Sequence, residues 1–316
     1  MVGDIIRSIE EAENILILTH VNPDGDAIGS SYALKKGLET LGKRVYAVTE
    51  EPVSDYFHMF KEEFISYDEF NEEYDLVISL DTGDMKRLGK CAELFSGETI
   101  VIDHHKTNEG YGKFNYIDGD SASCGEIIAD FLEDMNIYIS PEAATGLYAA
   151  ILTDTGGFIY QNTTPETHRK AARLIEVGAD YIYINKKLIE EKSYESHKAS
   201  AVCIEKMEFY AGGKLCIVVL DNDYCIKNNI TKSSINGLSS LPRTVCGVDT
   251  GVLISEVEKG KTKVSLRTDS IVDAAEISVM FGGGGHKRAA GFISEELTPF
   301  EMKEKLIEII TARLED

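Results

Sequence analysis

The chain lacks a hydrophobic run long enough to cross a membrane, and it begins without the pattern of a secretion signal. Its 316 residues contain no stretch of about 18 apolar residues, and a membrane-spanning helix needs about 20. The opening segment MVGDIIRSIEEAEN is acidic and helical in pattern, which is the wrong chemistry for a signal peptide. We therefore expect a cytoplasmic protein with no membrane partner.

Paired cysteines with the spacing of a redox motif or a zinc site are also absent. The chain has six cysteines, and no two of them form a CxxC arrangement. This pattern favours reduced thiols over disulfides or structural zinc. It agrees with the expected cytoplasmic location.

Basic residues are scarce relative to acidic ones. The chain has 32 Lys and Arg against 54 Asp and Glu, which gives a formal net charge of −22. Proteins that bind long nucleic acids present a basic stripe, because phosphate neutralisation supplies most of their affinity. No such stripe occurs here, and acidic stretches such as residues 50–73 would repel a polyanion. We expect short phosphorylated ligands and no long duplex, although solubility explains the charge excess equally well.

What the chain does contain is Asp and His residues at four separated places. Three groups follow strand-like runs at residues 15–18, 76–80 and 99–102, and the fourth follows an Ala-rich stretch that reads as a helix. The residues are His20, Asp24, Asp26, Asp81, Asp103, His104, His105 and Asp154. In open α/β sheets, sites form beyond the carboxyl ends of the strands. We therefore predict that these side chains gather at one edge of a parallel sheet.

The ligand types in these groups indicate the kind of metal they would bind. Carboxylates and imidazoles without a thiolate favour Mn²⁺, Mg²⁺ or Co²⁺ over structural zinc. A carboxylate between two ions can bridge metals about 3.5–4 Å apart, the spacing of two-metal phosphoryl-transfer sites. Pro23 and Gly25 force a turn, so that Asp24 and Asp26 can point toward different ions.

A run of four glycines, residues 282–285, precedes His286 in the second half of the chain. An isolated glycine run is more often a flexible loop or a helix stop. Glycines also let backbone N–H groups approach an anion closely, as in phosphate-binding nests. Because Lys287 and Arg288 follow His286 directly, we favour phosphate binding here.

These motifs together resemble those of the DHH phosphoesterase family. Its motifs I to IV resemble HVNPDGDAIGS from His20, DTGDMKRLG from Asp81, DHH at 103–105 and TDTGGF around Asp154. The substrate-binding signature of the DHH-associated C-terminal domain resembles FGGGGHKRAAGF from Phe281. Order and spacing agree from His20 to Phe292, nearly the whole chain. The short two-domain form resembles the nanoRNase/3′-phosphoadenosine 5′-phosphate phosphatase group of that family.

The resemblance implies a role for each group of residues. Two divalent ions are implied, with Mn²⁺ expected first and Mg²⁺ or Co²⁺ as alternatives. One ion would be held by His20, Asp24 and Asp81, and the other by Asp26, Asp81, His104 and Asp154. Asp81 and His105 would be catalytic, His105 contacting a phosphate oxygen or protonating the leaving oxygen, and Asp103 would orient an imidazole. Substrate would also be bound by Arg267, Gly283, Gly284, Gly285 and His286.

The implied activity is hydrolysis of short oligonucleotides to mononucleotides and of 3′-phosphoadenosine 5′-phosphate to AMP. Short oligonucleotides and nucleotide bisphosphates would be the partners, and a homodimer is left open. A cyclic- or linear-dinucleotide phosphodiesterase and a non-hydrolytic nucleotide-sensing module are the alternatives. An inorganic pyrophosphatase would share the first four motifs but lack the glycine signature, and a processive exonuclease would need extra domains and a basic channel.

The order of predicted elements indicates an α/β fold with two domains. In residues 1–180, predicted strands (15–18, 44–48, 75–80, 99–102) alternate with predicted helices (27–41, 123–135, 141–152, 165–177), which indicates a doubly wound parallel sheet. Residues 181–203 are charged and helical in pattern, and form a connector or a helix packed on the first domain. A smaller α+β domain is predicted for 204–316, with strands at 204–210, 215–220, 248–257 and 262–267 and helices at 273–280 and 299–313.

Overall fold

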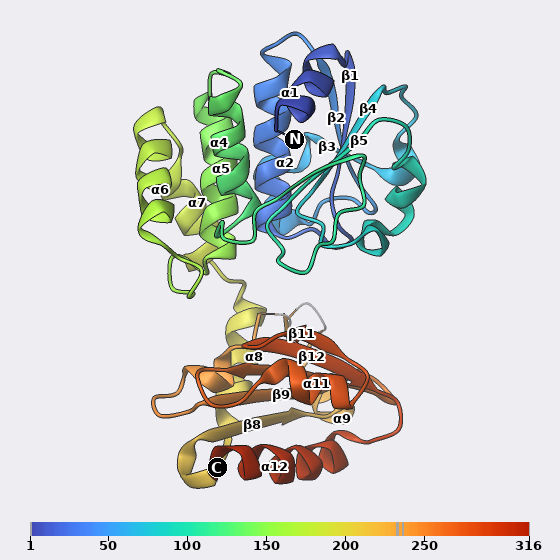
Figure 1. The fold of residues 1–316 in the computed structure, drawn as a ribbon. Coiled ribbons are helices and arrows are strands. Elements are labelled where there is room, and N and C mark those ends of the chain that lie inside the picture. Colours follow the sequence, from blue (N-terminus) through green and yellow to red (C-terminus); the bar gives the residue numbers. More distant parts are fainter. Residues whose placement is uncertain (1, 232–233, 236, 316) are drawn as a thin grey trace. The chain divides into compact units, whose positions relative to one another are not determined.

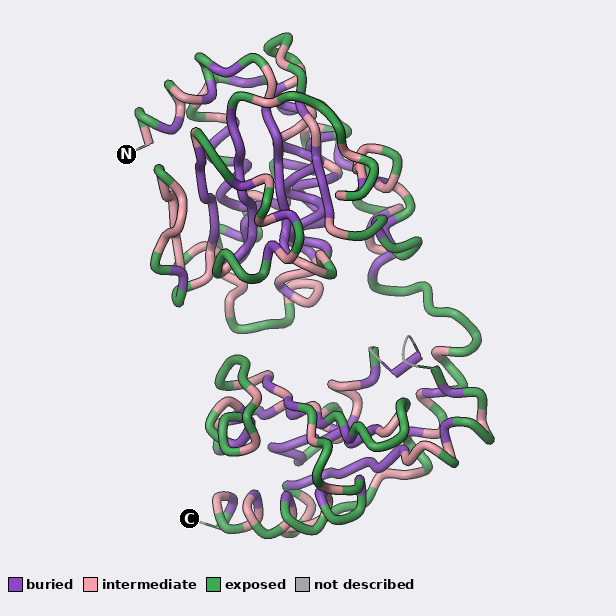
Figure 2. Tube along the Cα trace, turned by 90° about the vertical axis from the view of Figure 1, so that its right-hand side faces the viewer, coloured by how far each residue is buried: buried purple, intermediate pink, exposed green. Residues whose placement is uncertain are grey.

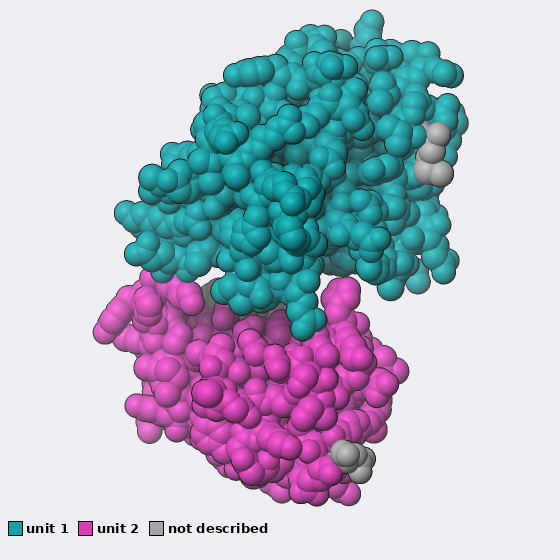
Figure 3. All heavy atoms as spheres, turned by 60° about the vertical axis from the view of Figure 1, so that its left-hand side comes forward, with its two compact units in different colours: residues 1–191 teal, residues 192–316 magenta. Residues whose placement is uncertain are grey.

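The structure, a computed structural model, describes residues 2–231, 234–235 and 237–315. The chain forms two compact units, residues 1–191 and residues 192–316 (Figure 3). This division falls inside the segment 181–203 that the sequence suggested as a connector. Helix α7 (Tyr181–Asn185) and a π-helical turn (Lys186–Glu190) belong to the first unit, and helix α8 (Tyr194–Glu205) belongs to the second.

The first unit is built on a parallel sheet of six strands (Figure 1). The strands are β1 (Asn14–Leu18), β2 (Arg44–Thr49), β3 (Phe64–Ser66), β4 (Leu76–Leu80), β5 (Thr99–Asp103) and β6 (Phe114–Ile117). Their order is β3-β2-β1-β4-β5-β6, and every neighbouring pair is parallel. The order reverses between β1 and β4, the kind of position at which open α/β sheets bind ligands. The predicted α/β class and parallel sheet are confirmed.

Hydrophobic side chains are buried on both faces of this sheet, as expected for parallel strands. The strands are accordingly coloured as buried along most of their length (Figure 2). Ile15 and Ile17 face a core completed mainly by helices, whereas Leu16 and Leu18 face a smaller core that includes the 3₁₀ segment Met85–Leu94. The helices of the unit, besides α7, are α1 (Val2–Glu11), α2 (Gly25–Glu39), α3 (His58–Lys61), α4 (Cys124–Asp134), α5 (Pro141–Asp154) and α6 (Pro165–Val177).

Helices α2 and α5 approach each other closely because glycines lie between them. A Cβ atom on Gly29 would clash with the carbonyl oxygen of Gly146, and one on Gly25 would clash with the side chain of Thr153. The two contacts show that the helices run antiparallel. The amino-terminal end of α2 therefore lies beside the carboxyl-terminal end of α5, and both ends carry predicted metal ligands.

The second unit contains a mixed six-stranded sheet of order β11-β12-β10-β9-β8-β7. The strands are β7 (Glu208–Tyr210), β8 (Leu215–Leu220), β9 (Thr250–Glu258), β10 (Lys261–Thr268), β11 (Gly284–His286) and β12 (Ala289–Ser294). Helices α11 (Ala274–Met280) and α12 (Pro299–Glu315) complete the core on one face, and α8 and α9 (Asn222–Lys227) complete the core on the other. The second sheet agrees with the predicted α+β character.

The sequence misjudged several short or unusual elements. The predicted strand at 204–210 is wrong in its first part, because α8 continues to Glu205 and buries Ala199 and Cys203 on one face. Strand β12 was not predicted from AAGFIS, although within it the alternate residues Ala290 and Phe292 are buried in the core. The edge strands β3, β6 and β11 were not predicted, because three or four residues are too few to show a period. Among the described residues, no helix is both long and apolar enough to cross a membrane.

Candidate metal centre and substrate-binding residues

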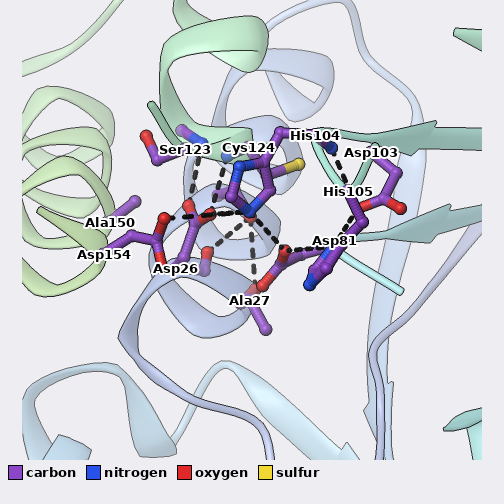
Figure 4. A network of polar contacts seen from close by, with 12 residues as sticks. Asp26, Ala27, Asp81, Asp103, His104, His105, Ser123, Cys124, Ala150 and Asp154 are labelled. Carbon is purple, nitrogen blue, oxygen red and sulfur yellow. Dashed lines mark hydrogen bonds and ion pairs between the residues drawn. The ribbon is translucent and has the colours of Figure 1, made fainter. Parts of the chain in front are cut away.

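The strand order brings the four Asp and His groups to one edge of the parallel sheet. Strands β1, β4 and β5 are adjacent, and His20, Asp81 and His104 lie at or just beyond their carboxyl ends. Helix α2 supplies Asp26 from its first turn, and α5 ends on Asp154. Residues as far apart in the sequence as Asp26 and Asp154 therefore meet in one place (Figure 4). His20 joins them through Asp81, because the ligand atoms of these two residues lie within 4.8 Å of each other.

Asp81 lies between two groups of possible ligands. Its Oδ2 is 3.8 Å from Nε2 of His20, and its Oδ1 is 3.4 Å from Nε2 of His104. The residue is 2% exposed and adopts a left-handed backbone conformation with φ of 51°, which is costly for a non-glycine residue and is concentrated at functional sites. Among the residues the structure describes, Asp81 Oδ1 accepts no hydrogen bond. One carboxylate thus offers one oxygen to each group.

The first group consists of His20, Asp24 and Asp81, whose ligand atoms lie within 4.8 Å of one another. The Nδ1 atom of His20 is 2.9 Å from the carbonyl oxygen of Val21. A proton on Nδ1 makes this contact a hydrogen bond and leaves Nε2 as the ligand atom. Asp24 caps α2, because its Oδ1 accepts from the backbone N–H groups of Asp26 and Ala27, while its Oδ2 lies 3.9 Å from His20 Nε2.

The second group consists of Asp26, His104 and Asp154, again within 4.8 Å. His104 Nε2 lies 3.7 Å from Asp26 Oδ2 and 3.8 Å from Asp154 Oδ2. Asp26 also accepts hydrogen bonds from the backbone N–H groups of Cys124 and Gly125, at 2.7 and 2.8 Å. These donors begin α4, so that the partial positive charge of a helix amino terminus stabilises the buried carboxylate.

The buried carboxylates of the centre repel one another, and burial together with this repulsion raises the pKa values of Asp26 and Asp154. Burial and the charges of Asp81 and Asp154 raise the pKa of Asp26 well above its usual value. Burial, opposed by His104 and reinforced by Asp81 and Asp24, raises the pKa of Asp154 to about 6. Burial lowers the pKa of His104, but the attraction of Asp81, Asp26 and Asp154 outweighs it and raises that pKa to about 10. Divalent cations in place of these protons would relieve the repulsion, and the donor set fits them.

Asp103 contacts both histidines of the DHH segment, the ring of His105 and the backbone of His104. Its Oδ1 accepts from the backbone N–H of His104 at 2.9 Å and lies 2.7 Å from Nδ1 of His105. Asn108 donates to its Oδ2 at 2.7 Å and also to the carbonyl oxygen of Thr82, next to Asp81. Asp103 is fully buried. This geometry is the one expected if Asp103 orients an imidazole. The Nδ1 atom of His105 is hydrogen-bonded to Asp103.

In the second unit, Arg267 and His286 lie on the same face of the sheet. Ala289 of β12 is opposite Arg267 on one side and opposite His286 on the other. Residues opposite one another in adjacent strands share a face, so that Ala289 stands between Arg267 and His286 in the register of the sheet. Two strand spacings place their backbones about 10 Å apart. This is a suitable span for two groups that contact one nucleotide.

The glycine run forms a different structure from the nest that the sequence suggested. Residues 284–286 form the edge strand β11, paired with β12. A Cβ atom on Gly283 would clash with the carbonyl oxygen of Gly291 and the side chain of Phe292, which explains the need for glycine there. Arg267 donates to Ser239 Oγ at 3.1 Å. The substrate-binding assignment of these residues remains a prediction.

Two asparagines that hydrogen-bond to residues of the centre were not predicted from the sequence. Asn162 donates to the carbonyl oxygen of Asp154 at 3.1 Å, to its Oδ2 at 3.3 Å and to the carbonyl oxygen of Ala122 at 2.9 Å. Asn108 joins Asp103 to Thr82, as described above. Both asparagines follow a recognised motif by a few residues. Proximity to a motif was the only available signal, and it does not distinguish a turn residue from a supporting one.

We expect Asn162→Ala to weaken ion binding at the second group without unfolding the protein. Losing a partner that orients a metal ligand typically costs about 10- to 100-fold in metal affinity or activity. Equilibrium dialysis with Mn²⁺ would measure the change. Asn115→Ala is a matched control, because it removes an asparagine of β6 whose side chain hydrogen-bonds to the backbone of Gly112 and belongs to neither ligand group. Unchanged Mn²⁺ affinity in Asn162→Ala would contradict the orienting function.

Comparison with known proteins places this architecture in a family. Residues 14–151 match the N-terminal domain of the DHH family, and residues 212–316 match the DHHA1 domain. A relative from Thermus thermophilus, named bifunctional oligoribonuclease and PAP phosphatase NrnA, is 32% identical over 316 residues, covering 99% of this chain and 94% of its own length. The chain therefore belongs to the DHH phosphoesterase family.

Two further proteins are similar over nearly their whole length. A Streptococcus mutans protein, named probable bifunctional oligoribonuclease and PAP phosphatase NrnA, is 30% identical over 302 residues, with 94% of each chain covered. The crystal structure of an exopolyphosphatase-related protein from Bacteroides fragilis superposes with a TM-score of 0.92 at 25% identity, covering 100% of this chain and 97% of that one. The similarity includes both units of the chain.

Proposed function

We propose that this protein is a binuclear metal-dependent phosphoesterase that hydrolyses short oligonucleotides to mononucleotides and 3′-phosphoadenosine 5′-phosphate to AMP. The observation that carries the proposal is Asp81, whose two oxygens face two separate groups of Asp and His ligands. The names of the Thermus and Streptococcus relatives supply the substrate class.

Two divalent ions fit the residues present. His20, Asp24 and Asp81 would hold one, and Asp26, Asp81, His104 and Asp154 would hold the other. Two ions at such a site supply Lewis acidity toward a phosphate ester and lower the pKa of the attacking water. We infer Mn²⁺ as the ion, with Mg²⁺ and Co²⁺ as alternatives, because the donors are oxygen and imidazole nitrogen without thiolate.

The remaining residues would bind the substrate and handle the proton. His105, held through Nδ1 by Asp103 at 2.7 Å, would contact a phosphate oxygen or protonate the leaving oxygen, tasks that suit an imidazole near neutral pH. Arg267, the glycine strand and His286 would bind another part of the nucleotide.

The alternatives are less favoured. A dinucleotide phosphodiesterase would use the same centre, but the similar relatives are named for oligoribonuclease and PAP phosphatase activity. A nucleotide sensor without turnover would not need a complete ligand set. Here the ligand atoms within each group lie within 4.8 Å of one another.

The proposal is tested by measuring hydrolysis with Mn²⁺ across oligonucleotides of two to about 20 nucleotides, together with 3′-phosphoadenosine 5′-phosphate, cyclic dinucleotides and pyrophosphate. With a net charge of −22, added phosphates gain little from counterion release. We expect kcat/KM to be highest at about two to five nucleotides, the number of phosphates that a metal pair and one further anion site can hold. It should fall with length, and more steeply at low salt. Efficiency that rises steadily to 20 nucleotides would contradict the short-substrate proposal.

His286→Ala and Arg267→Ala should weaken substrate binding and leave the metal content unchanged. Both residues lie in the second unit, outside the two ligand groups. Losing a charged hydrogen bond costs about 1.5–3 kcal/mol, which corresponds to an increase in KM of about 10- to 150-fold. Some loss of kcat is also expected, because binding energy contributes to positioning. Lys263→Ala, on β10 but four residues from Arg267, is a control. Unchanged kinetics on every nucleotide would contradict substrate binding by Arg267 and His286.

A further inference from the structure

The loop between α5 and α6, residues 155–164, starts at a candidate metal ligand and returns to it (Figure 1). Asp154 is the last residue of α5, and Asn162 donates back to the carbonyl and the carboxylate of Asp154. The backbone N–H of Tyr160 donates to the carbonyl of Thr155, the residue after Asp154, at 3.0 Å. The backbone of Tyr160 is therefore tied to the residue that follows the candidate ligand Asp154.

The backbone of this loop is tightly coiled and internally bonded. Three consecutive residues, Gly156, Gly157 and Phe158, have positive φ values of 58°, 73° and 66°. The hydroxyl of Thr155 accepts from the backbone N–H of Phe158 at 3.1 Å. These features order the backbone of the loop and fix the points from which its side chains leave.

The loop carries two large apolar side chains that the fold does not bury. Ile159 is 79% exposed and Tyr160 is 56% exposed. Phe158, by contrast, is half-buried and stacks on His168 with a centroid distance of 5.1 Å. The ring of Tyr160 lies against Gly156, where a Cβ atom would collide with it. The loop thus supports the ring from the side of Gly156.

We propose that Tyr160, with Ile159 beside it, is a stacking platform for the base of the nucleotide whose phosphate is at the metal centre. This inference rests on the proposed function, because it requires a nucleotide substrate. Base–aromatic stacking accepts every base, which suits an enzyme that acts on short oligonucleotides of any sequence. It also supplies affinity that a chain of net charge −22 gains poorly from phosphate contacts.

The test compares Tyr160→Ala with Tyr160→Phe on nucleotide substrates and on the corresponding abasic sugar phosphates. Tyr160→Ala should raise KM for a dinucleotide and for 3′-phosphoadenosine 5′-phosphate by about 5- to 150-fold, the range that stacking energies imply. KM for ribose 3,5-bisphosphate should stay within about twofold, since that compound has no base to stack. Tyr160→Phe keeps the ring and should behave as the wild type.

Tyr138→Ala is the matched control, because Tyr138 is 70% exposed in the loop that precedes α5. Tyr138 precedes α5 and Tyr160 follows it, and the two ends of this 14-residue helix are about 21 Å apart. Tyr138 is therefore an exposed tyrosine at the other end of the same helix. Mn²⁺ content and the thermal unfolding midpoint of Tyr160→Ala should match the wild type. Because the chain has no tryptophan, a 2-aminopurine dinucleotide offers a direct signal: its fluorescence should be quenched on binding to the wild type and less so with Tyr160→Ala.

The outcomes separate the two proposals. Active wild-type protein with unchanged KM in Tyr160→Ala would overturn the platform and leave the proposed function standing. Equal losses on nucleotide and abasic substrates would also overturn it, since the ring would then act on the loop. A change of molecular mass in solution without a change in KM would assign the two side chains to a protein contact instead. A wild type that hydrolyses no nucleotide would overturn the proposed function and the platform together.

Discussion

Asp81→Ala should reduce kcat/KM on a dinucleotide by about 10³-fold or more, beyond the 10- to 100-fold typical of a supporting residue. The reason is that one carboxylate faces both ligand groups, with Oδ2 at 3.8 Å from His20 Nε2 and Oδ1 at 3.4 Å from His104 Nε2. Removing it leaves each group one ligand short. Bound Mn²⁺, measured by equilibrium dialysis and elemental analysis, should fall below two ions per chain.

The matched control is Asp68→Ala, which removes a carboxylate that is 76% exposed and belongs to none of the ligand groups. That variant should keep wild-type turnover and metal content. If Asp81→Ala retained near-normal turnover with two bound ions, the binuclear assignment would be wrong. Unfolding of Asp81→Ala is distinguished from loss of the site by its thermal midpoint. Asp81→Asn keeps the shape of the side chain and provides a second variant for that comparison.

Metal affinity should rise steeply with pH, and the slope should change near pH 6. A raised pKa means that the folded, metal-free protein holds protons that an ion must displace. His104, with its pKa raised to about 10, remains protonated across the neutral range and contributes about tenfold in affinity per pH unit. Asp154, with its pKa raised to about 6, contributes a second factor of about ten only below that pH.

Titration calorimetry with Mn²⁺ between pH 5 and 8 in buffers of different ionisation enthalpy would measure both the affinity and the number of protons released. Asp154→Asn should remove the extra steepness below about pH 6. The raised pKa of Asp154 also affects the stability of the folded protein. A carboxyl whose folded pKa is raised favours the folded state at low pH, and this contribution is lost as pH rises through about 6. The stabilisation gained on adding Mn²⁺ should therefore increase from pH 5 to pH 7, and an affinity independent of pH would contradict the assignment.

The local sequence was sufficient to predict elements with strong periodicity and clear ends. Helix α6 begins after Thr164 with Pro165 and ends at Gly178, which adopts the left-handed conformation expected of a helix stop. Strands β1, β4 and β5 were visible because parallel strands are buried on both faces and read as continuous apolar runs. The sequence could not predict β12 from AAGFIS, because small residues suit a helix as well as a strand until the neighbouring strands are known.

The chemical groups of this protein could be identified from the sequence: Asp and His at strand ends, glycines before His286, and a strong negative charge. Which of those groups meet depends on the folding of the chain. The reversal of strand order between β1 and β4 places His20, Asp81 and His104 side by side, and the glycine contact between α2 and α5 brings Asp26 to Asp154. The contacts of Asn162 with Asp154, and of Asp26 with the start of α4, could be identified only from the folded chain. The same is true of the exposure of Tyr160. Residue types and their periodicity are properties of the local sequence, whereas the distances between side chains depend on which distant segments pack together.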